Sequence, residues 1–214
     1  MNITDACVFP YPCGDSSVRR MALEASALGF DSLIAIDASA GEYAGVLVRP
    51  GVLIHNTPVR DIINRVKRAK DSDTVIAVHA GNNGFNRAVI GMKGIHILSG
   101  IHIAEKNAFD HVAAKMASDN SVAIDIDLSP LIFCRGITRQ RALHRYRDVL
   151  VLERRFEFAV VLSSHARSIL DMRAVREITG LCSLLDMETE DVEKALSAIG
   201  KVTARLEPAT RVVR

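Results

Sequence analysis

Side chains able to bind a metal or move a proton follow several apolar segments of this 214-residue chain. The segments are predicted strands, and in barrels of parallel strands the chemistry sits at the strands' C-terminal ends. The residues there are Asp37, His55, His79, Asp127 and Ser163-Ser164-His165. Carboxylates and imidazoles converging from several strands are typical ligands of hydrolytic metal centres. A metal-dependent phosphoesterase is therefore one hypothesis that these residues raise.

Two further arrangements suggest nucleophilic catalysis. Ser163-Ser164-His165 places hydroxyls beside an imidazole, and Cys134 lies in an arginine-rich loop that favours a reactive thiolate. A catalytic triad is assembled by the fold and not by adjacency, and no feature supplies a substrate pocket for Cys134. We interpret both as structural. Asp125 and Asp127 share one face of a predicted strand, so either carboxylate caps a helix or binds a basic neighbour.

The most basic stretch follows that strand. From Arg135 to Arg155 there are seven arginines and two acidic residues, a local net charge of +5 in a chain of net charge +2. Thr138 is the expected N-cap of a helix ending near Phe156, whose apolar arc comprises Ala142, Leu143, Tyr146, Val149, Leu150 and Phe156. A solvated face usually mixes in lysine, whereas arginine's planar fork suits phosphate and carboxylate. We predict an anion-binding face at Arg135, Arg139, Arg141, Arg145, Arg154 and Arg155.

The surrounding elements alternate between strand and helix. Strands are expected at 3–9, 32–37, 46–55, 74–79, 95–98, 122–128 and 158–162, and helices at 16–28, 58–70, 85–90, 107–119, 138–156, 170–181 and 190–199. Arg49-Pro50-Gly51 predicts that 46–55 is a bent strand or a hairpin, and Ser129-Pro130 predicts a loop. No GxGxxG or P-loop motif favours an open nucleotide-binding sheet. The order therefore predicts an α/β fold, a single irregular TIM-like (β/α) barrel of seven or eight strands over residues 1–202, with 203–214 as a flexible tail.

The composition excludes several classes of protein. No apolar run approaches 18 residues, and the N-terminus lacks a charged segment before an apolar one, so neither a membrane span nor a signal peptide is predicted. The four cysteines include no Cys-x-x-Cys pair, which indicates free thiols and a cytoplasmic protein. An aromatic content of 5% without tryptophan argues against a base-stacking platform for single strands.

Several tracts between residues 95 and 185 resemble one family. They are Asn107-Ala108-Phe109-Asp110-His111-Val112, the run AIDIDLSPL from Ala123 to Leu131, Arg135-Gly136 with the arginine helix, Val160-Val161-Leu162-Ser163-Ser164, and the run from Ser168 to Ile178. This order is similar to archaeal ribonuclease P protein component 3, whose eukaryotic relatives are subunits of nuclear ribonuclease P. The resemblance implies a barrel like that of the polymerase-and-histidinol-phosphatase superfamily.

Metallo-hydrolases of that superfamily open the first strand with a His-x-His pair. This chain has Asp5-Ala6-Cys7 there, and none of its seven histidines forms such a pair. We therefore expect no metal, cofactor or catalytic residue, and predict a vestigial strand-end pocket at Asp37, His79, Asp127 and His165. His79→Ala and His165→Ala are then expected to lower stability only modestly.

The resemblance implies a subunit of ribonuclease P, which removes the 5′ leader of precursor tRNA. In that family the RNA is catalytic, Mg²⁺ acts on the RNA, and component 3 pairs with protein component 2. The arginine face would then contact ribonuclease P RNA or the other ribonuclease P proteins, and precursor tRNA only indirectly. Two alternatives stay open at this point: an active metal-dependent phosphoesterase, and a barrel that binds a protein partner without touching RNA.

Overall fold

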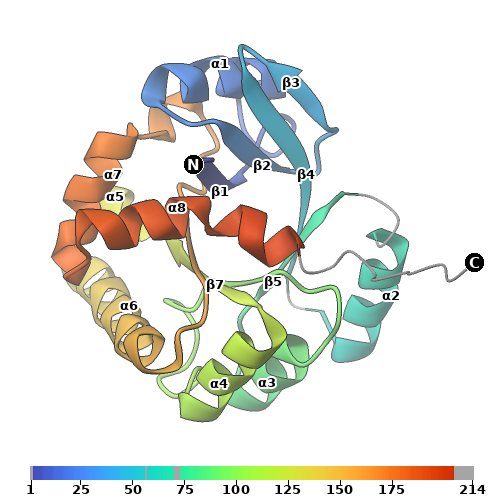
Figure 1. Ribbon diagram of the computed structural model, residues 1–214, viewed down its shortest axis with the longest axis vertical. Helices are drawn as coiled ribbons and strands as arrows, with labels where there is room; N and C mark the ends of the chain where they lie inside the picture. The colour runs from blue at the N-terminus through green and yellow to red at the C-terminus, as the bar shows by residue number, and fades with distance from the viewer. Residues whose placement is uncertain (1, 56, 70–72, 205–214) are drawn as a thin grey trace, which may run out of the picture.

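Seven parallel strands form a nearly closed barrel in the computed structural model, which describes residues 2–55, 57–69 and 73–204 (Figure 1). In barrel order they are β1 (Thr4–Val8), β2 (Ser32–Ile36), β4 (Val46–Ile54), β5 (Val75–His79), β6 (Ile97–Ser99), β7 (Ala123–Asp127) and β8 (Val160–Ser163). The seam between β8 and β1 is closed by one parallel bridge, Val8 with Ala166. Around it, the Phe9 N–H donates to the Ala166 carbonyl at 2.8 Å, and the His165 N–H to the Cys7 carbonyl at 3.0 Å. The predicted single-domain α/β barrel is confirmed.

Helices surround this barrel (Figure 1). They are α1 (Val18–Leu28), α2 (Val59–Ala69), α3 (Asn83–Ile90), α4 (His111–Asn120), α5 (Ser129–Phe133), α6 (Gly136–Phe156), α7 (Val175–Cys182) and α8 (Thr189–Ala204), with short 3-10 turns η1 (Ile169–Asp171) and η2 (Ser183–Leu185). As predicted, α6 packs its apolar arc inward, burying Ala142, Tyr146, Val149 and Leu150. No helix within the described residues is long and apolar enough to cross a membrane.

The two faces of each barrel strand meet different environments. In β7, Ile124 and Ile126 are 0% exposed and belong to the core shared with the outer helices. Ala123 belongs to a second apolar cluster in the barrel interior, which Ala198, Ile199 and Val202 of α8 join. Because Ala123 begins β7, α8 closes the N-terminal end of the barrel, which Figure 1 shows it crossing. The ionisable cluster described below lies at the opposite, C-terminal end of the barrel.

The strand β4 differs from the prediction of a bend or hairpin, since it runs unbroken through Pro50. Its ladder with the short antiparallel strand β3 (Gly41–Tyr43) ends at Val48, and its ladder with β5 begins at Gly51. Pro50 therefore lies where one side of the strand has no ladder partner. Proline lacks a backbone N–H, and at this position the strand needs no hydrogen bond from it.

Helix boundaries also differ from the predictions. The segment after β7 is the helix α5 and not a loop, because the Asp127 carboxylate accepts the Ser129 N–H at 2.7 Å and Pro130 suits a first turn. Thr138 is not the N-cap of α6; Gly136, with φ of 55°, turns the chain into the helix directly after Arg135. The end of α8 includes Thr203 and Ala204, so these two residues are not part of a tail. The rest of the predicted tail lies outside the described residues.

Replacing Ile126 by alanine tests the packing of β7. We expect Ile126→Ala to lower the free energy of unfolding by about 2–5 kcal/mol, because the lost transfer energy adds to the cost of a cavity. Urea unfolding measures this, with Ile137→Ala as the control, since the Ile137 side chain in α6 is 73% exposed. A loss below about 1 kcal/mol would show that β7 is not packed between barrel and helices.

Candidate functional site

A cavity of about 480 Å³ opens at the C-terminal end of the barrel. It is lined by Phe9, Leu53, His55, His79, Gly100, His102, Ile103, Asp127, Ser129, Phe133, His165, Arg167 and Asp171. Of the four residues predicted for a strand-end pocket, the structure brings three together here: His79, Asp127 and His165. Asp37 also follows its strand, but it is exposed and does not line the cavity.

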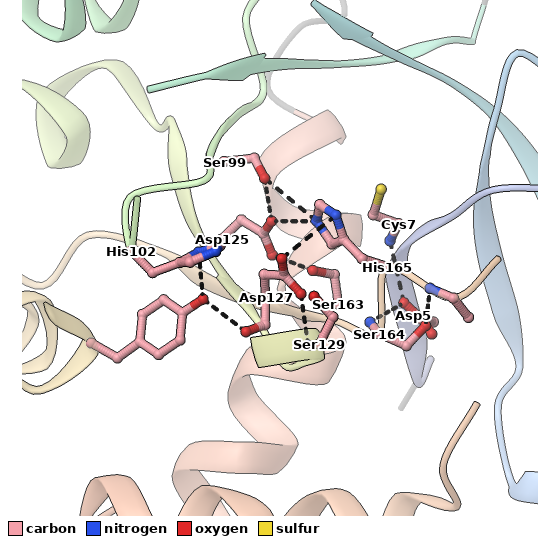
Figure 2. Close-up of polar contacts among 12 residues, drawn as sticks. Asp5, Cys7, Ser99, His102, Asp125, Asp127, Ser129, Ser163, Ser164 and His165 are labelled. Carbon is pink, nitrogen blue, oxygen red and sulfur yellow. Dashed lines mark hydrogen bonds and ion pairs between the residues drawn. The ribbon is translucent and has the colours of Figure 1, made fainter. Parts of the chain in front are cut away.

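Asp125 is the centre of the polar network beside this cavity (Figure 2). Its carboxylate is 2% exposed and accepts hydrogen bonds from Ser99 Oγ at 2.5 Å, Ser163 Oγ at 2.6 Å and His165 Nε2 at 3.0 Å. Burial alone would raise the pKa of Asp125, but the bond to His165 and its charge outweigh burial and lower it. Asp125 is therefore an ionised carboxylate saturated by donors from three other segments.

His165 carries the matching positive charge. Burial alone would lower its pKa, but contact with Cys7 and the bond to Asp125 outweigh burial and raise the pKa well above the ordinary value. Its Nδ1 lies 3.7 Å from Asp127 Oδ2, so the imidazolium bridges two carboxylates. The residue has φ of 50°, a left-handed conformation that is costly for a side chain of this size. In this conformation the His165 backbone N–H donates to the Cys7 carbonyl across the seam at 3.0 Å.

Asp127 joins the cluster to the arginine helix. Its carboxylate caps α5, and its backbone carbonyl accepts the Tyr146 hydroxyl at 2.7 Å. The Tyr146 oxygen also lies 2.8 Å from His102 Nδ1, and since its proton goes to the carbonyl, Nδ1 is the donor. Burial lowers the pKa of His102. His102 is thus a neutral ring whose unprotonated nitrogen is Nε2.

Asp5 and Cys7 of β1 complete the cluster on the other side of the seam (Figure 2). Asp5 Oδ1 accepts the backbone N–H groups of Ser164 at 3.0 Å and Cys7 at 3.2 Å. Its Oδ2 is buried without a partner among the described residues, and burial raises the pKa of Asp5 to about 6. Burial also raises the pKa of the Cys7 thiol, which leaves it a poor nucleophile.

The polar side chains at these strand ends already bond to one another. The Asp125 oxygens are taken by three donors, Asp127 is engaged by Ser129 and His165, and the His165 nitrogens face the two carboxylates. Within the described ranges no three His, Cys, Asp or Glu side chains form a group that could hold a metal ion. Asp125, Asp127 and His165 are therefore engaged with one another and with Ser99, Ser129 and Ser163.

His55 and His79 lie apart from that network, across the cavity. Their ring centroids are 5.0 Å apart. The pKa of His55 is lowered, mainly by burial and to a smaller extent by repulsion from the neighbouring His79. The space for the His79 ring depends on Gly100, where a Cβ would lie 2.2 Å from His79 Nε2. Gly100 also has φ of 72°, so both the turn and the ring require glycine there.

The arginines of α6 divide into two groups. Three bind carbonyl groups of neighbouring loops: Arg145 donates to Lys106 at 2.9 Å, Arg147 to Leu184 at 2.8 Å and Arg154 to Asp186 at 2.9 Å. Arg145 and Arg154 were predicted for the free outer face, so that prediction needs correction: they also fix the fold. Nearer the solvent, Arg155 stacks over Phe156 with 5.3 Å to the ring centroid, and Arg135 bonds only to nearby carbonyls.

The remaining two predicted arginines differ in exposure. Arg141 is exposed, and its side chain makes no hydrogen bond or ion pair with any described residue. Arg139 is half-buried, with its Nε unpaired among the described residues. Arg135, Arg139, Arg141 and Arg155 are thus the members of the predicted face that remain available for a ligand.

Sequence reasoning missed several members of the strand-end cluster: Asp5, Cys7, Ser99, His102 and Tyr146. Ser99 carried a usable signal, because it ends a predicted strand as Asp127 does. Tyr146 was placed correctly on the buried arc, but its hydroxyl contact depends on where a loop 44 residues away lies. The structure changes the expectation for His165→Ala: because the imidazole contacts Asp125 and Asp127, we now expect a larger loss of stability than the modest one predicted from the sequence.

Fold and site together define a class of protein: a TIM-like α/β barrel whose strand ends hold a buried polar network centred on Asp125 and His165. The family model for RNase P subunit p30 matches residues 1–207, so this chain belongs to that family.

Individual relatives agree with this assignment. Ribonuclease P protein component 3 of Methanothermobacter thermautotrophicus is 30% identical over 200 residues, which cover 86% of this chain and 81% of the relative. The protein of that name from Methanococcoides burtonii is 39% identical over 132 residues, covering 62% of this chain and 55% of the relative.

Solved structures share the fold. A chain in a cryo-EM structure of archaeal ribonuclease P with mature tRNA has a TM-score of 0.77 at 21% identity, covering 98% of this chain and 95% of that chain. A prolidase complexed with N-methylphosphonate-L-proline has a TM-score of 0.59 at 10% identity, covering 95% of this chain and 74% of that chain. At these identities both likenesses concern the fold alone.

Replacing His165 by glutamine tests the buried ion pair. The folded-state pKa of His165 lies above its ordinary value of 6.5, so its contribution is complete below about pH 6.5 and is lost as pH rises through the folded-state value. We expect His165→Gln to lower the free energy of unfolding by about 3–5 kcal/mol at pH 6, because buried carboxylates are left unpaired. The difference from the unsubstituted protein should shrink at pH 9.

Urea unfolding in the presence of a reductant measures both values. The control is His144→Gln in α6, whose side chain is 70% exposed, and its effect should be small at either pH. A His165→Gln effect that is the same at pH 6 and pH 9 would mean that His165 does not gain its proton on folding.

Proposed function

We propose that this chain is protein component 3 of an archaeal ribonuclease P, the ribonucleoprotein that removes the 5′ leader of precursor tRNA. The observation that carries the proposal is the family match over residues 1–207, with a relative of that name 30% identical over most of both chains. In this assignment the holoenzyme is the endoribonuclease, and the chain supports the catalytic RNA together with protein component 2.

The chain itself is non-catalytic in this proposal. Support comes from the strand-end cluster, where the Asp125 carboxylate and the His165 imidazolium bind each other, and no three His, Cys, Asp or Glu side chains among the described residues form a group that could hold a metal ion. The chain accordingly needs no cofactor, and Mg²⁺ acts on the RNA. We place the protein in the cytoplasm, in keeping with its four free cysteines.

The available arginines of α6 are proposed to contact ribonuclease P RNA or a protein partner. Cations beside phosphates release counterions, so such contacts give a salt-dependent affinity that does not read base sequence. With a net charge of only +2, the chain alone should bind RNA weakly. Assembly with other ribonuclease P proteins then supplies the rest of the affinity.

Reconstitution tests the assignment as a whole. We expect precursor-tRNA cleavage by ribonuclease P RNA and the other protein components to fall markedly when this chain is omitted and to return when it is added. Chain treated exhaustively with a chelator, then assayed with Mg²⁺ restored, should perform as well as untreated chain. Full cleavage without the chain would overturn the assignment, and lost stimulation after chelation would point to a bound metal.

Two pairs of arginines in α6 separate ligand contact from folding. Arg141→Ala/Arg155→Ala removes available cations, so we expect unchanged stability and an RNA salt slope reduced by about two. Arg147→Ala/Arg154→Ala removes donors to the loop around Asp186, so stability should fall with little change in slope. If the first pair instead weakens binding to protein component 2 and leaves the slope unchanged, this face docks protein.

A further inference from the structure

We infer that α2 presents a second surface for the RNA phosphate backbone, separate from the arginines of α6; the inference rests on the proposed function. The helix buries Ile62 and Val66 against the barrel. At 100° per residue, Arg60, Lys67 and Arg68 fall on the opposite side, within one arc of about 100°. The segment from Val59 to Ala69 carries four cations and one acid, so its net charge is +3.

The cations of α2 are free, unlike half of those on α6. The side chains of Arg60, Arg65, Lys67 and Arg68 are exposed and make no hydrogen bond or ion pair with any described residue. On α6, the corresponding cations Arg145, Arg147 and Arg154 bind loop carbonyls. An unpaired, hydrated guanidinium is available to bind an external phosphate without first breaking a contact of the fold.

A neighbouring loop packs against the inner side of α2. A Cβ at Gly94 would be 2.7 Å from Cγ1 of the buried Val66. Gly94 also has φ of 94°, so glycine is needed for both its conformation and its close approach. Lys93, the residue before it, is exposed, so this loop carries a further cation near the helix.

The chemistry of this surface favours RNA over protein. Protein interfaces have cores enriched in aromatic and apolar side chains and depleted of charge. The exposed side of α2 offers only one large apolar side chain, Ile63, at 40% exposure, and no aromatic. A surface of cations with little apolar area matches a polyanion whose backbone is recognised by charge.

The position of α2 makes its contact distinct from that of α6. Figure 1 shows the two helices on different sides of the barrel, with the sheet between them. One rigid body with cations on two sides can contact two separate segments of a folded RNA. The barrel would then fix the distance between those segments.

Paired substitutions test the inference. We expect Arg60→Ala/Arg68→Ala to reduce by about two the slope of log affinity against log salt for in vitro transcribed ribonuclease P RNA. The matched control is Arg19→Ala/Arg20→Ala, which removes two exposed arginines from α1, and its slope should equal that of the unsubstituted protein. Circular dichroism melts of both variants should match the unsubstituted protein, because none of these side chains packs in the core.

The outcomes are distinguishable from failure of the proposed function. Loss of slope in the α2 variant, with the control unchanged, supports the inference. An unchanged slope overturns it, as does equal loss in both variants, which would show only general charge. Weakened binding to protein component 2 with an unchanged RNA slope also overturns it, in favour of protein docking. Unsubstituted chain that fails to stimulate precursor-tRNA cleavage overturns the proposed function itself.

Discussion

A carboxylate enclosed in a barrel must find its counter-charge inside that barrel, and Asp125 does so in His165. Removing one partner of such a pair destabilises the fold far more than replacing both partners by apolar residues, because the remaining charge stays buried. The other polar groups follow from this one: Ser99 and Ser163 supply the remaining donors, and Asp127 takes the far side of the imidazolium.

This arrangement separates the inside of the protein from its outside in chemical terms. Inside, the charges of Asp125 and His165 are matched to each other. Outside, exposed cations on α2 and part of α6 have no partner among the described residues, and they are carried on helices that the barrel holds rigid. The buried charges therefore act on stability, and the exposed cations are the ones that an external anion can reach.

The sequence predicted much of this fold, because alternation along strands and periodicity along helices are local properties. The strand of Ala123–Asp127 was predicted within a residue or two at each end, and Asp125 and Asp127 were predicted to share one of its faces. Asp37 failed as a pocket residue because φ of 55° turns it away after β2, and residue type does not reveal that turn. Arg145 failed as a free cation because helical periodicity identifies an outer arc but not the loop beside it. The loop carbonyl that binds it comes from Lys106, 39 residues away.

The seam between β1 and β8 has a consequence for how the chain reaches its native state. The contact of Asp5 with Ser164 joins residues 159 apart, a separation that folding satisfies slowly. Before that contact forms, the sheet is open and has two unpaired edges, each a template for another chain. The polar cluster at the barrel mouth therefore also holds the first and last strands of the barrel together. Substitutions that loosen it would favour association between unfinished molecules, a fault that appears as poor yield in cells before it appears in any equilibrium measurement.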